Sequence, residues 1–284
     1  MLRADAPDLD AAGQLPWGVL DGRTIIMSGG LRGVGLAMAA SACQQGANVV
    51  ILTRPLAEKV GGPPVVERVA IPGGEAIAVH GDIRREADVQ VAVQTAVDHF
   101  GGIDVCVNIA SVLALTGTEA LSTETFDLMH QVNVRGAFLL TRACIGLLRN
   151  SDHAHILTIS PPLNMSERWL GAHPGYTSSK YGMTILGLGW AAELMEAGIA
   201  SNCLWPQSTI ATPGSQTLLA GEVGARSRRP EVMGDAAMEI LSRPPSAVTG
   251  RCFLDVDVLH QAGIDDLSGY GGGARPDLDL FVDA

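Results

Sequence analysis

Tyr176 and Lys180 lie four residues apart in the segment PGYTSSKYGM, whose proline is suited to the first turn of a helix. At that spacing two side chains share one face of a helix. A free tyrosine with a pKa near ~10 transfers protons poorly at neutral pH, and a nearby ammonium group lowers that pKa toward the working range. The pair therefore indicates proton transfer by a phenol with an amine beside it. An exposed helical pair without a chemical role is the alternative, but the chain has only three tyrosines and two lysines, so chance explains the spacing poorly.

A glycine-rich turn, SGGLRGVG at residues 28 to 35, follows the apolar run at residues 24 to 28 and precedes a helix-compatible stretch at residues 36 to 45. Glycines at such a turn allow a sharp bend, a close approach to a phosphate and tight packing of helix against strand. The free N–H groups at the start of the helix bind an anion. The position between the first strand and the first helix favours a nucleotide-binding turn over a purely structural one.

Strand and helix signals alternate along the rest of the chain, which predicts an α/β fold: a doubly wound, Rossmann-type parallel sheet of seven strands with helices on both faces. We expect a leader at residues 1 to 20 and a single domain at residues 21 to 284. The expected strands are residues 24 to 28, 49 to 52, 76 to 80, 103 to 110, 155 to 160, 199 to 204 and 252 to 259. The expected helices are residues 36 to 45, 86 to 99, 122 to 148 as one helix or two abutting ones, and 174 to 195.

Three segments are predicted to be irregular. Residues 61 to 74 form a Gly/Pro-rich connection, and residues 264 to 284 form a C-terminal arm. Residues 207 to 230 follow the end of a strand, where ligands bind in such sheets, so they form either a substrate lid or an unstructured connection. The apolar Leu218 and Leu219 in this segment favour an apolar substrate.

The glycine turn resembles the TGxxxGxG fingerprint of short-chain dehydrogenases/reductases, with Ser28 in place of Thr, and Tyr176 and Lys180 match the YxxxK motif of that family. Asn133, in HQVNVRGAF, matches the asparagine that continues the family's proton relay through water. The resemblance covers residues 21 to 259 and implies an oxidoreductase with a nicotinamide cofactor. It assigns cofactor contacts to Ser28, Gly29, Arg32, Gly33, Val34, Gly35, Thr53, Arg54, Asp82, Ile83, Asn108, Ala110, Lys180, Pro206 and Thr209.

Two parts of this assignment rest on short matches. Asp82 and Ile83 resemble the family's adenine-contacting pair. Residues 108 to 111, NIAS, resemble its NNAG turn, with Ile109 and Ser111 as the departures.

The end of the second strand favours NADP(H) over NAD(H). In the family, an acidic residue at this place accepts a hydrogen bond from the ribose 2′-OH of NAD and repels a 2′-phosphate. Here Thr53 and Arg54 occupy the place, and Arg32 adds a second guanidinium that can bind a phosphate through paired hydrogen bonds. The alternative is that both arginines are ordinary solvated charges.

The segment after the fifth strand departs from the family pattern. The family usually has two serines there, the second of which orients the substrate carbonyl, whereas this chain has Ser160 followed by Pro161. The spacing to the tyrosine is two residues longer than usual, so Ser160, Asn164 or Ser166 could supply the donor, and we expect Ser160. Gln207 similarly replaces the glycine of the PG motif after the sixth strand.

Composition excludes several other classes of protein. A net charge of −11 argues against nucleic-acid and membrane partners. The N-terminus has no secretory signal, and no apolar run reaches the roughly 18 residues of a spanning helix, which predicts a cytoplasmic protein. The five scattered cysteines are expected to be buried free thiols. His153 and His155 lack further ligands nearby, so no metal site is predicted.

These observations predict an NADP(H)-dependent oxidoreductase that interconverts a carbonyl and a hydroxyl on a small apolar or fatty-acyl-like substrate. Tyr176, Lys180, Asn133 and Ser160 form the expected catalytic set. Similar proteins assemble through their long helices, which implies a homodimer or homotetramer. Two alternatives stay open: a catalytically impaired NADP(H)-binding sensor or scaffold, and a structural subunit of a hetero-oligomer.

Overall fold

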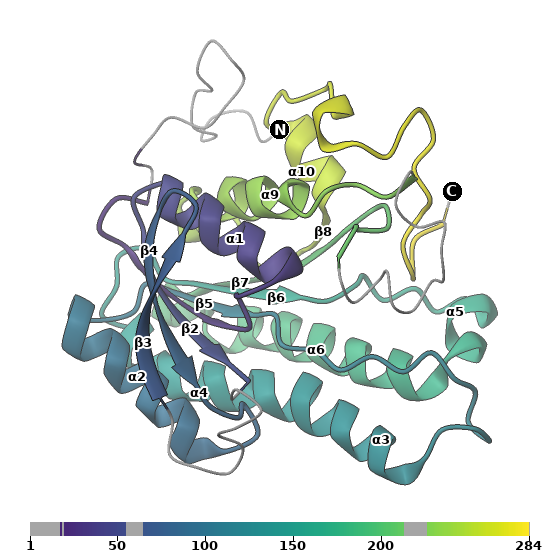
Figure 1. The fold of residues 1–284 in the computed structure, drawn as a ribbon, viewed down its shortest axis with the longest axis horizontal. Helices are drawn as coiled ribbons and strands as arrows, with labels where there is room; N and C mark the ends of the chain where they lie inside the picture. Colours follow the sequence, from purple (N-terminus) through teal and green to yellow (C-terminus); the bar gives the residue numbers. More distant parts are fainter. Residues whose placement is uncertain (1–17, 19, 55–64, 213–225, 284) are drawn as a thin grey trace.

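A twisted sheet with the strand order β3-β4-β2-β1-β5-β6-β7-β8 runs through the middle of the molecule, with helices on both faces (Figure 1). The structure is a computed structural model that describes residues 18, 20 to 54, 65 to 212 and 226 to 283. The strands are β1 (Thr24–Ser28), β2 (Asn48–Thr53), β3 (Val65–Ile71), β4 (Gly74–His80), β5 (Val105–Asn108), β6 (His155–Ile159), β7 (Ala200–Trp205) and β8 (Cys252–Leu254).

The seven predicted strands all form and pair in parallel, and β3 adds an eighth strand that runs antiparallel to β4. The prediction of an irregular connection at residues 61 to 74 was therefore wrong from Val65 onward. A tight turn joins β3 to β4, with Ile71 opposite Gly74 and Gly73 at a φ of 95°. The β-branched residues of VVERVAI favour the extended conformation on either side of that turn.

The last strand is shorter than predicted. β8 ends at Leu254, and the helix α10 (Asp255–Gln261) begins where residues 255 to 259 were expected to continue the strand. The acidic Asp255 and Asp257 lie in the first turn of α10, where carboxylates interact favourably with the helix dipole. A second helix, α9 (Glu231–Leu241), follows the segment predicted as a lid.

The helices form two layers, one on each face of the sheet (Figure 1). The first layer holds α1 (Gly33–Gln44), α9 and α10. The second holds α2 (Glu86–Phe100), α4 (Ala137–Leu148) and α6 (Pro174–Glu193). Since both faces are covered, β1, β5, β6 and β7 are buried along their whole length, as continuous apolar runs in a parallel sheet predict.

The predicted helix at residues 122 to 148 consists of α3 (Thr123–Met129), a π-helical segment at His130–Gly136 and α4. The side chain of Ser122 caps α3 by accepting a hydrogen bond from the Thr125 N–H at 3.2 Å. A further short helix, α5 (Glu167–Ala172), lies between β6 and α6. None of the described helices has the length and apolarity needed to cross a bilayer.

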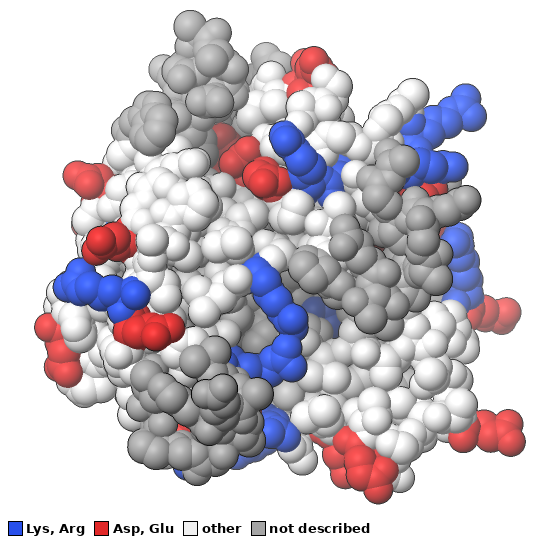
Figure 2. All heavy atoms as spheres, in the orientation of Figure 1, with Lys and Arg blue, Asp and Glu red and all other residues white. Residues whose placement is uncertain are grey.

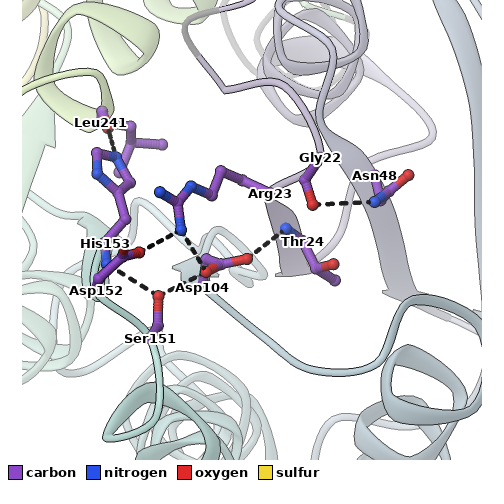
Figure 3. Close-up of polar contacts among 9 residues, drawn as sticks. All are labelled: Gly22, Arg23, Thr24, Asn48, Asp104, Ser151, Asp152, His153 and Leu241. Carbon is purple, nitrogen blue, oxygen red and sulfur yellow. Dashed lines mark hydrogen bonds and ion pairs between the residues drawn. The ribbon is translucent and has the colours of Figure 1, made fainter.

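The amino ends of the strands are tied together by a polar network (Figure 3). The Arg23 guanidinium contacts Asp104 at 3.3 Å and Asp152 at 2.5 Å. Asp104 also accepts hydrogen bonds from the Thr24 N–H at 2.8 Å and the Ser151 hydroxyl at 2.5 Å. These contacts join the start of β1 to the segments before β5 and β6. The opposite edge, where the strands end, holds the predicted site.

Candidate active site

The carboxyl ends of the parallel strands bring the predicted site residues to one edge of the sheet. The glycine turn follows β1, Thr53 and Arg54 follow β2, and residues 108 to 110 follow β5. β1 lies between β2 and β5, so the chain leaves β1 where the strand order changes direction. Ligands bind at this switch point in doubly wound sheets.

The turn after β1 needs glycine at specific positions. Gly29 and Gly33 have φ values of 78° and 54°, in the left-handed region that disfavours side chains. A Cβ on Gly35 would lie 2.9 Å from the Cα of Gly30, so α1 packs directly against the turn. No side chain caps α1, whose first turn carries no acidic residue. The N–H groups of this turn therefore suit an anion such as a nucleotide phosphate.

The Ser28 side chain links the turn after β1 to the turn after β5. Its hydroxyl accepts hydrogen bonds from the N–H groups of Ile109 at 3.1 Å and Ala110 at 3.2 Å. The residue itself is buried. Ser28 thus fixes the turn after β1 against the turn after β5, which sets the shape of the cofactor region.

Arg32 and Arg54 are both exposed, and no ion pair joins either of them to a carboxylate within the described residues. Arg32 immediately precedes α1, and Arg54 follows β2. Figure 2 shows basic side chains gathered beside a hollow in the middle of this face, over the region where α1 begins in Figure 1. Guanidinium groups beside the glycine turn are donors of the kind that bind phosphate.

Other residues with a predicted cofactor contact bind within the protein. The Asp82 carboxylate accepts hydrogen bonds from the Arg84 side chain at 2.9 Å, which together with the guanidinium charge lowers its pKa. Ile83 is buried and packs against Gly136, where an added Cβ would lie 2.9 Å from the Ile83 side chain. The Asn108 amide donates to the Thr141 hydroxyl at 2.9 Å, toward α4. These side chains shape the backbone around the site.

Tyr176 and Lys180 lie in the first turns of α6, with exposures of only 4% and 2%. The Lys180 amine donates a hydrogen bond to the Ile159 carbonyl, at the end of β6, at 2.6 Å. It also lies 5.0 Å from the ring centre of Trp205, at the end of β7. The two residues of the YxxxK motif are therefore held at the edge of the sheet where the cofactor turn lies.

The electrostatic effect of this burial differs from the expectation. Burial, with a smaller effect of Asp279, raises the pKa of Tyr176 instead of lowering it. Burial lowers the pKa of Lys180 to about 7, against the opposing influence of Cys203 and Asp279. The reason is that both groups are removed from water, which disfavours the charged form of each. At neutral pH the phenol keeps its proton and the amine is about half charged.

Asn133 lies in the π-helical segment and is fully buried. Its amide accepts from the Val112 N–H at 2.7 Å and donates to the Val112 carbonyl at 3.0 Å. It also donates to the Ser179 hydroxyl at 2.9 Å, and Ser179 belongs to α6. Asn133 therefore connects the segment after β5 to the helix that carries the tyrosine.

Ser160 is fully buried at the end of β6, and its hydroxyl has no hydrogen-bond partner among the described residues. Its hydroxyl lies near Cys203, whose pKa it lowers against larger opposing effects. Asn164 accepts a hydrogen bond from the Tyr181 hydroxyl through its carbonyl at 2.5 Å. Ser166 precedes α5 and is exposed. The donor role of Ser160 stays a prediction.

Pro206 and Thr209 lie in the segment after β7, as expected. Pro206 is buried, and the Thr209 hydroxyl contacts the Ser227 hydroxyl at 2.8 Å. The part of the predicted lid that holds Leu218 and Leu219 lies outside the described residues, so the lid is untested.

The C-terminal arm was missed as a part of the site. The Phe281 ring stacks on the Tyr176 ring with centroids 6.2 Å apart. It also contacts Trp169 at 5.7 Å, Tyr181 at 5.2 Å and Trp205 at 6.1 Å between ring centroids. The arm thus covers the tyrosine and closes an apolar, aromatic environment around it. The alternation of DLDLF is a weak strand signal that was consistent with such docking.

Sequence comparison decides the family. The sequence model described as short chain dehydrogenase matches residues 23 to 222. This chain belongs to the short-chain dehydrogenase family. The structure is similar to a solved short chain dehydrogenase of Mycobacterium thermoresistibile, which is 41% identical in sequence. The match covers 93% of this chain and 96% of that one, with a TM-score of 0.83. A short-chain dehydrogenase/reductase from Serratia marcescens, 27% identical, matches 83% of this chain and 96% of that one with a TM-score of 0.64.

The curated relatives include hydroxysteroid dehydrogenase-like protein 2 of Danio rerio, which is 41% identical over 94% of this chain. The human protein of the same name is 38% identical over 94% of this chain. The chain spans 65% and 66% of the lengths of these two relatives. Within the sequence, ISPPLN at residues 159 to 164 and NCLWP at residues 202 to 206 resemble this subgroup of the short-chain dehydrogenase family.

Proposed function

We propose that this short-chain dehydrogenase is an NADP(H)-dependent oxidoreductase that interconverts a carbonyl and a hydroxyl on a small apolar or fatty-acyl-like substrate. The observation that carries the proposal is the position of Tyr176 and Lys180 on α6, at the same sheet edge as the glycine turn. The substrate class follows from the aromatic side chains of Trp169, Trp205 and Phe281 around the tyrosine.

The proposed chemistry uses the phenol of Tyr176 as the proton donor to the substrate oxygen. NADPH, when bound, supplies the hydride. The raised pKa of Tyr176 keeps the phenol protonated at neutral pH, which is the form required to donate. The ammonium form of Lys180 stabilises the phenolate that remains, because opposite charges attract strongly where water is excluded. Asn133 and water restore the proton, and Ser160 orients the substrate carbonyl.

Lys180 also holds the cofactor ribose in this proposal, and the other cofactor residues fall into two groups. The backbone of residues 29 to 35 binds the phosphates at the start of α1, and Arg32 and Arg54 bind the 2′-phosphate. The second group acts through shape or backbone contacts. It comprises Ser28, Thr53, Asp82, Ile83, Asn108, Ala110, Pro206 and Thr209.

Replacing Tyr176 by Phe tests the catalytic assignment. The protein is mixed with NADPH and a panel of apolar ketones and 3-ketoacyl thioesters, and cofactor oxidation is followed by absorbance. We expect Tyr176→Phe to lose turnover by a factor of about 10² or more, because general acid catalysis contributes at least that much. Tyr270→Phe is the matched control, since its hydroxyl binds Asp235 at 2.6 Å, between α9 and the C-terminal segment. Full turnover by Tyr176→Phe would refute the assignment.

Replacing Arg54 by Ala tests the cofactor preference. The dissociation constants of NADPH and NADH are measured by quenching of tryptophan fluorescence. We expect the preference for NADPH to fall about tenfold, since a charge-assisted hydrogen bond contributes about 1.5–3 kcal/mol. Arg149→Ala is the control, because Arg149 is an exposed arginine at the end of α4, on the opposite edge of the sheet. Equal preference in both variants would assign the 2′-phosphate to other residues.

A second candidate function is an NADP(H)-binding sensor or scaffold with impaired catalysis. The cover over Tyr176 favours it, since only 4% of that residue is exposed. Tight binding of NADPH without turnover of any carbonyl would support this candidate. Absence of cofactor binding would instead support a structural subunit. The cytoplasmic location, the single domain at residues 21 to 284 and the homodimer or homotetramer stay predictions from the sequence.

A further inference from the structure

We propose that the C-terminal arm, residues 277 to 283, is part of the catalytic site and that its Asp279 is a positioning residue that holds positive charge on Lys180. This inference deepens the proposed function and rests on it for the role of the lysine. The arm and the lysine are about 100 residues apart in the sequence, so only the fold brings them together.

The first half of the arm pairs with the segment that follows β7. Ser208 and Leu278 form an antiparallel bridge. On either side of it, the Thr209 N–H donates to the Asp277 carbonyl at 2.8 Å and the Asp279 N–H donates to the Gln207 carbonyl at 3.0 Å. Backbone pairing on both sides of the bridge fixes the register, so the position of Asp279 along the arm is defined.

The second half of the arm is held by side chains around the site. The Trp205 indole donates to the Leu280 carbonyl at 2.9 Å, and the Trp169 indole donates to the Asp283 carboxylate at 3.0 Å. Between them, Phe281 inserts among the aromatic rings with a φ of 70°, a strained conformation for a residue with a side chain. Such strain persists only where the surrounding packing determines the conformation, so the arm is firmly seated.

The Trp205 side chain contacts both the arm and the Lys180 amine. One face of its ring lies 5.0 Å from the Lys180 amine, while its N–H binds the carbonyl of Leu280, the residue after Asp279. The Asp279 carboxylate accepts a hydrogen bond from the Leu280 N–H at 2.6 Å, which fixes its direction. Through these contacts the arm seats Asp279 beside the site, where a negative charge raises the pKa of both Lys180 and Tyr176.

Two other titratable groups, Asp255 and Cys203, act at this position. Burial raises the pKa of Asp255 to about 6, and its carboxylate accepts N–H groups of Gln207 and Val256. Contact with Cys252 and burial raise the pKa of the Cys203 thiol, which is therefore neutral. Asp279 itself, partly buried, has its pKa raised to about 7 by burial and by Asp255, against the effect of Lys180.

The charges of the carboxyl and the amine are therefore linked near neutral pH. An ionised Asp279 favours the ammonium form of Lys180, and a charged Lys180 favours the carboxylate. In the proposed chemistry the ammonium stabilises the phenolate of Tyr176, so the charge of Asp279 opposes the loss of that ammonium to burial.

Because Lys59 and Lys180 are the two lysines of the chain, the test reads the amine directly. The full chain is labelled with lysine carrying ¹³C at Cε, the Lys180 signal is assigned with Lys59→Arg, and its titration is followed by NMR. In Asp279→Asn we expect the midpoint to fall by about one pH unit, the effect of losing an opposite charge at short range. Asp277→Asn is the control, since Asp277 is exposed and pairs with Arg226 at 2.7 Å; its midpoint should not move.

The direction of the shift separates a charge effect from a packing effect. Phe281→Ala loosens the arm, rehydrates the amine and should raise the Lys180 midpoint toward the ordinary value of a lysine. A rise in Asp279→Asn would mean that the residue only tethers the arm, and an unchanged midpoint would mean that its charge does not reach the amine; either result overturns the proposal. Asp279→Ser, which keeps an acceptor for the Leu280 N–H, repeats the test if the Asn variant does not fold.

The readout does not depend on turnover or on the identity of the substrate. If Tyr176→Phe keeps full activity, the proposed function fails while the Lys180 titration still reports on Asp279. If the Lys180 midpoint ignores Asp279 while Tyr176→Phe abolishes turnover, the proposed function stands and this inference fails.

Discussion

Replacing Gly35 by Ala tests the close approach of α1 to the glycine turn. A Cβ at this position would lie 2.9 Å from Gly30 Cα and 3.0 Å from Gly30 N, which are backbone atoms that cannot rotate away. Overpacking of this kind costs about 1–3 kcal/mol. The better helix propensity of Ala offsets up to about 1 kcal/mol of that cost. Gly189→Ala, in α6, is the matched control, because nothing lies within 4 Å of its Cβ position.

The difference in unfolding free energy between the two variants isolates the steric cost, so we expect Gly35→Ala to be less stable than Gly189→Ala by about 1–3 kcal/mol. Thermal unfolding measures this as a lower Tm, by about 2–4 °C for each kcal/mol. We also expect NADPH to bind Gly35→Ala at least about tenfold more weakly, since the turn must move away from the start of α1. Equal melting temperatures together with unchanged NADPH binding would refute the packing argument and the anion site built on it.

Two further predictions concern the edge of the sheet away from the site. Burial, with a smaller effect of His153, lowers the pKa of His155 to about 3. Between pH 6.5 and 3 the unfolded chain therefore takes up a proton that the folded chain does not, so the stability of the fold falls as the pH falls. His155→Asn should remove that dependence. Urea unfolding at pH 7, 6 and 5 should show that the free energy of unfolding of the variant falls by about 1 kcal/mol less per pH unit than that of the wild type. The same fall with pH in both proteins would contradict the prediction. Arg23→Ala should cost no more than about 1 kcal/mol, because the pair is partly exposed and Asp104 keeps two other donors; a loss of several kcal/mol by urea unfolding would show that the network in Figure 3 acts as a unit.

Much of the fold could be predicted because buried parallel strands produce continuous apolar runs. The errors occur where a short run is ambiguous. CFLDVDVLH reads as one apolar segment, yet β8 ends at Leu254 and α10 follows, since Asp255 and Asp257 suit the first turn of a helix. Similarly, VVERVAI followed by Pro72 and two glycines is a hairpin signal that its Pro-rich surroundings obscured.

For the candidate site, residues that are close in the sequence could be predicted together, whereas distant ones could not. Tyr176 and Lys180 could be predicted because one turn of a helix relates them, and the glycine turn because its residues are contiguous. The arm could not, because no spacing rule relates Phe281 to a tyrosine 105 residues earlier. Their contact results from packing and from the backbone pairing at Ser208 and Leu278.

The burial produced by the arm also changes how the proton transfer must be understood. An exposed Tyr and Lys pair would lower the pKa of the phenol through the ammonium charge. Here both groups are buried, the tyrosine in part by Phe281 of the arm, so the phenol becomes a weaker acid and the ammonium a stronger one. A phenol in that state donates its proton only to a strong base, and the oxygen of a carbonyl that has just accepted a hydride is such a base. The same burial strengthens the attraction between phenolate and ammonium once the proton has moved. Within the proposed function, we therefore expect the covered site to favour reduction of a carbonyl over oxidation of an alcohol when a neighbouring charge keeps Lys180 protonated.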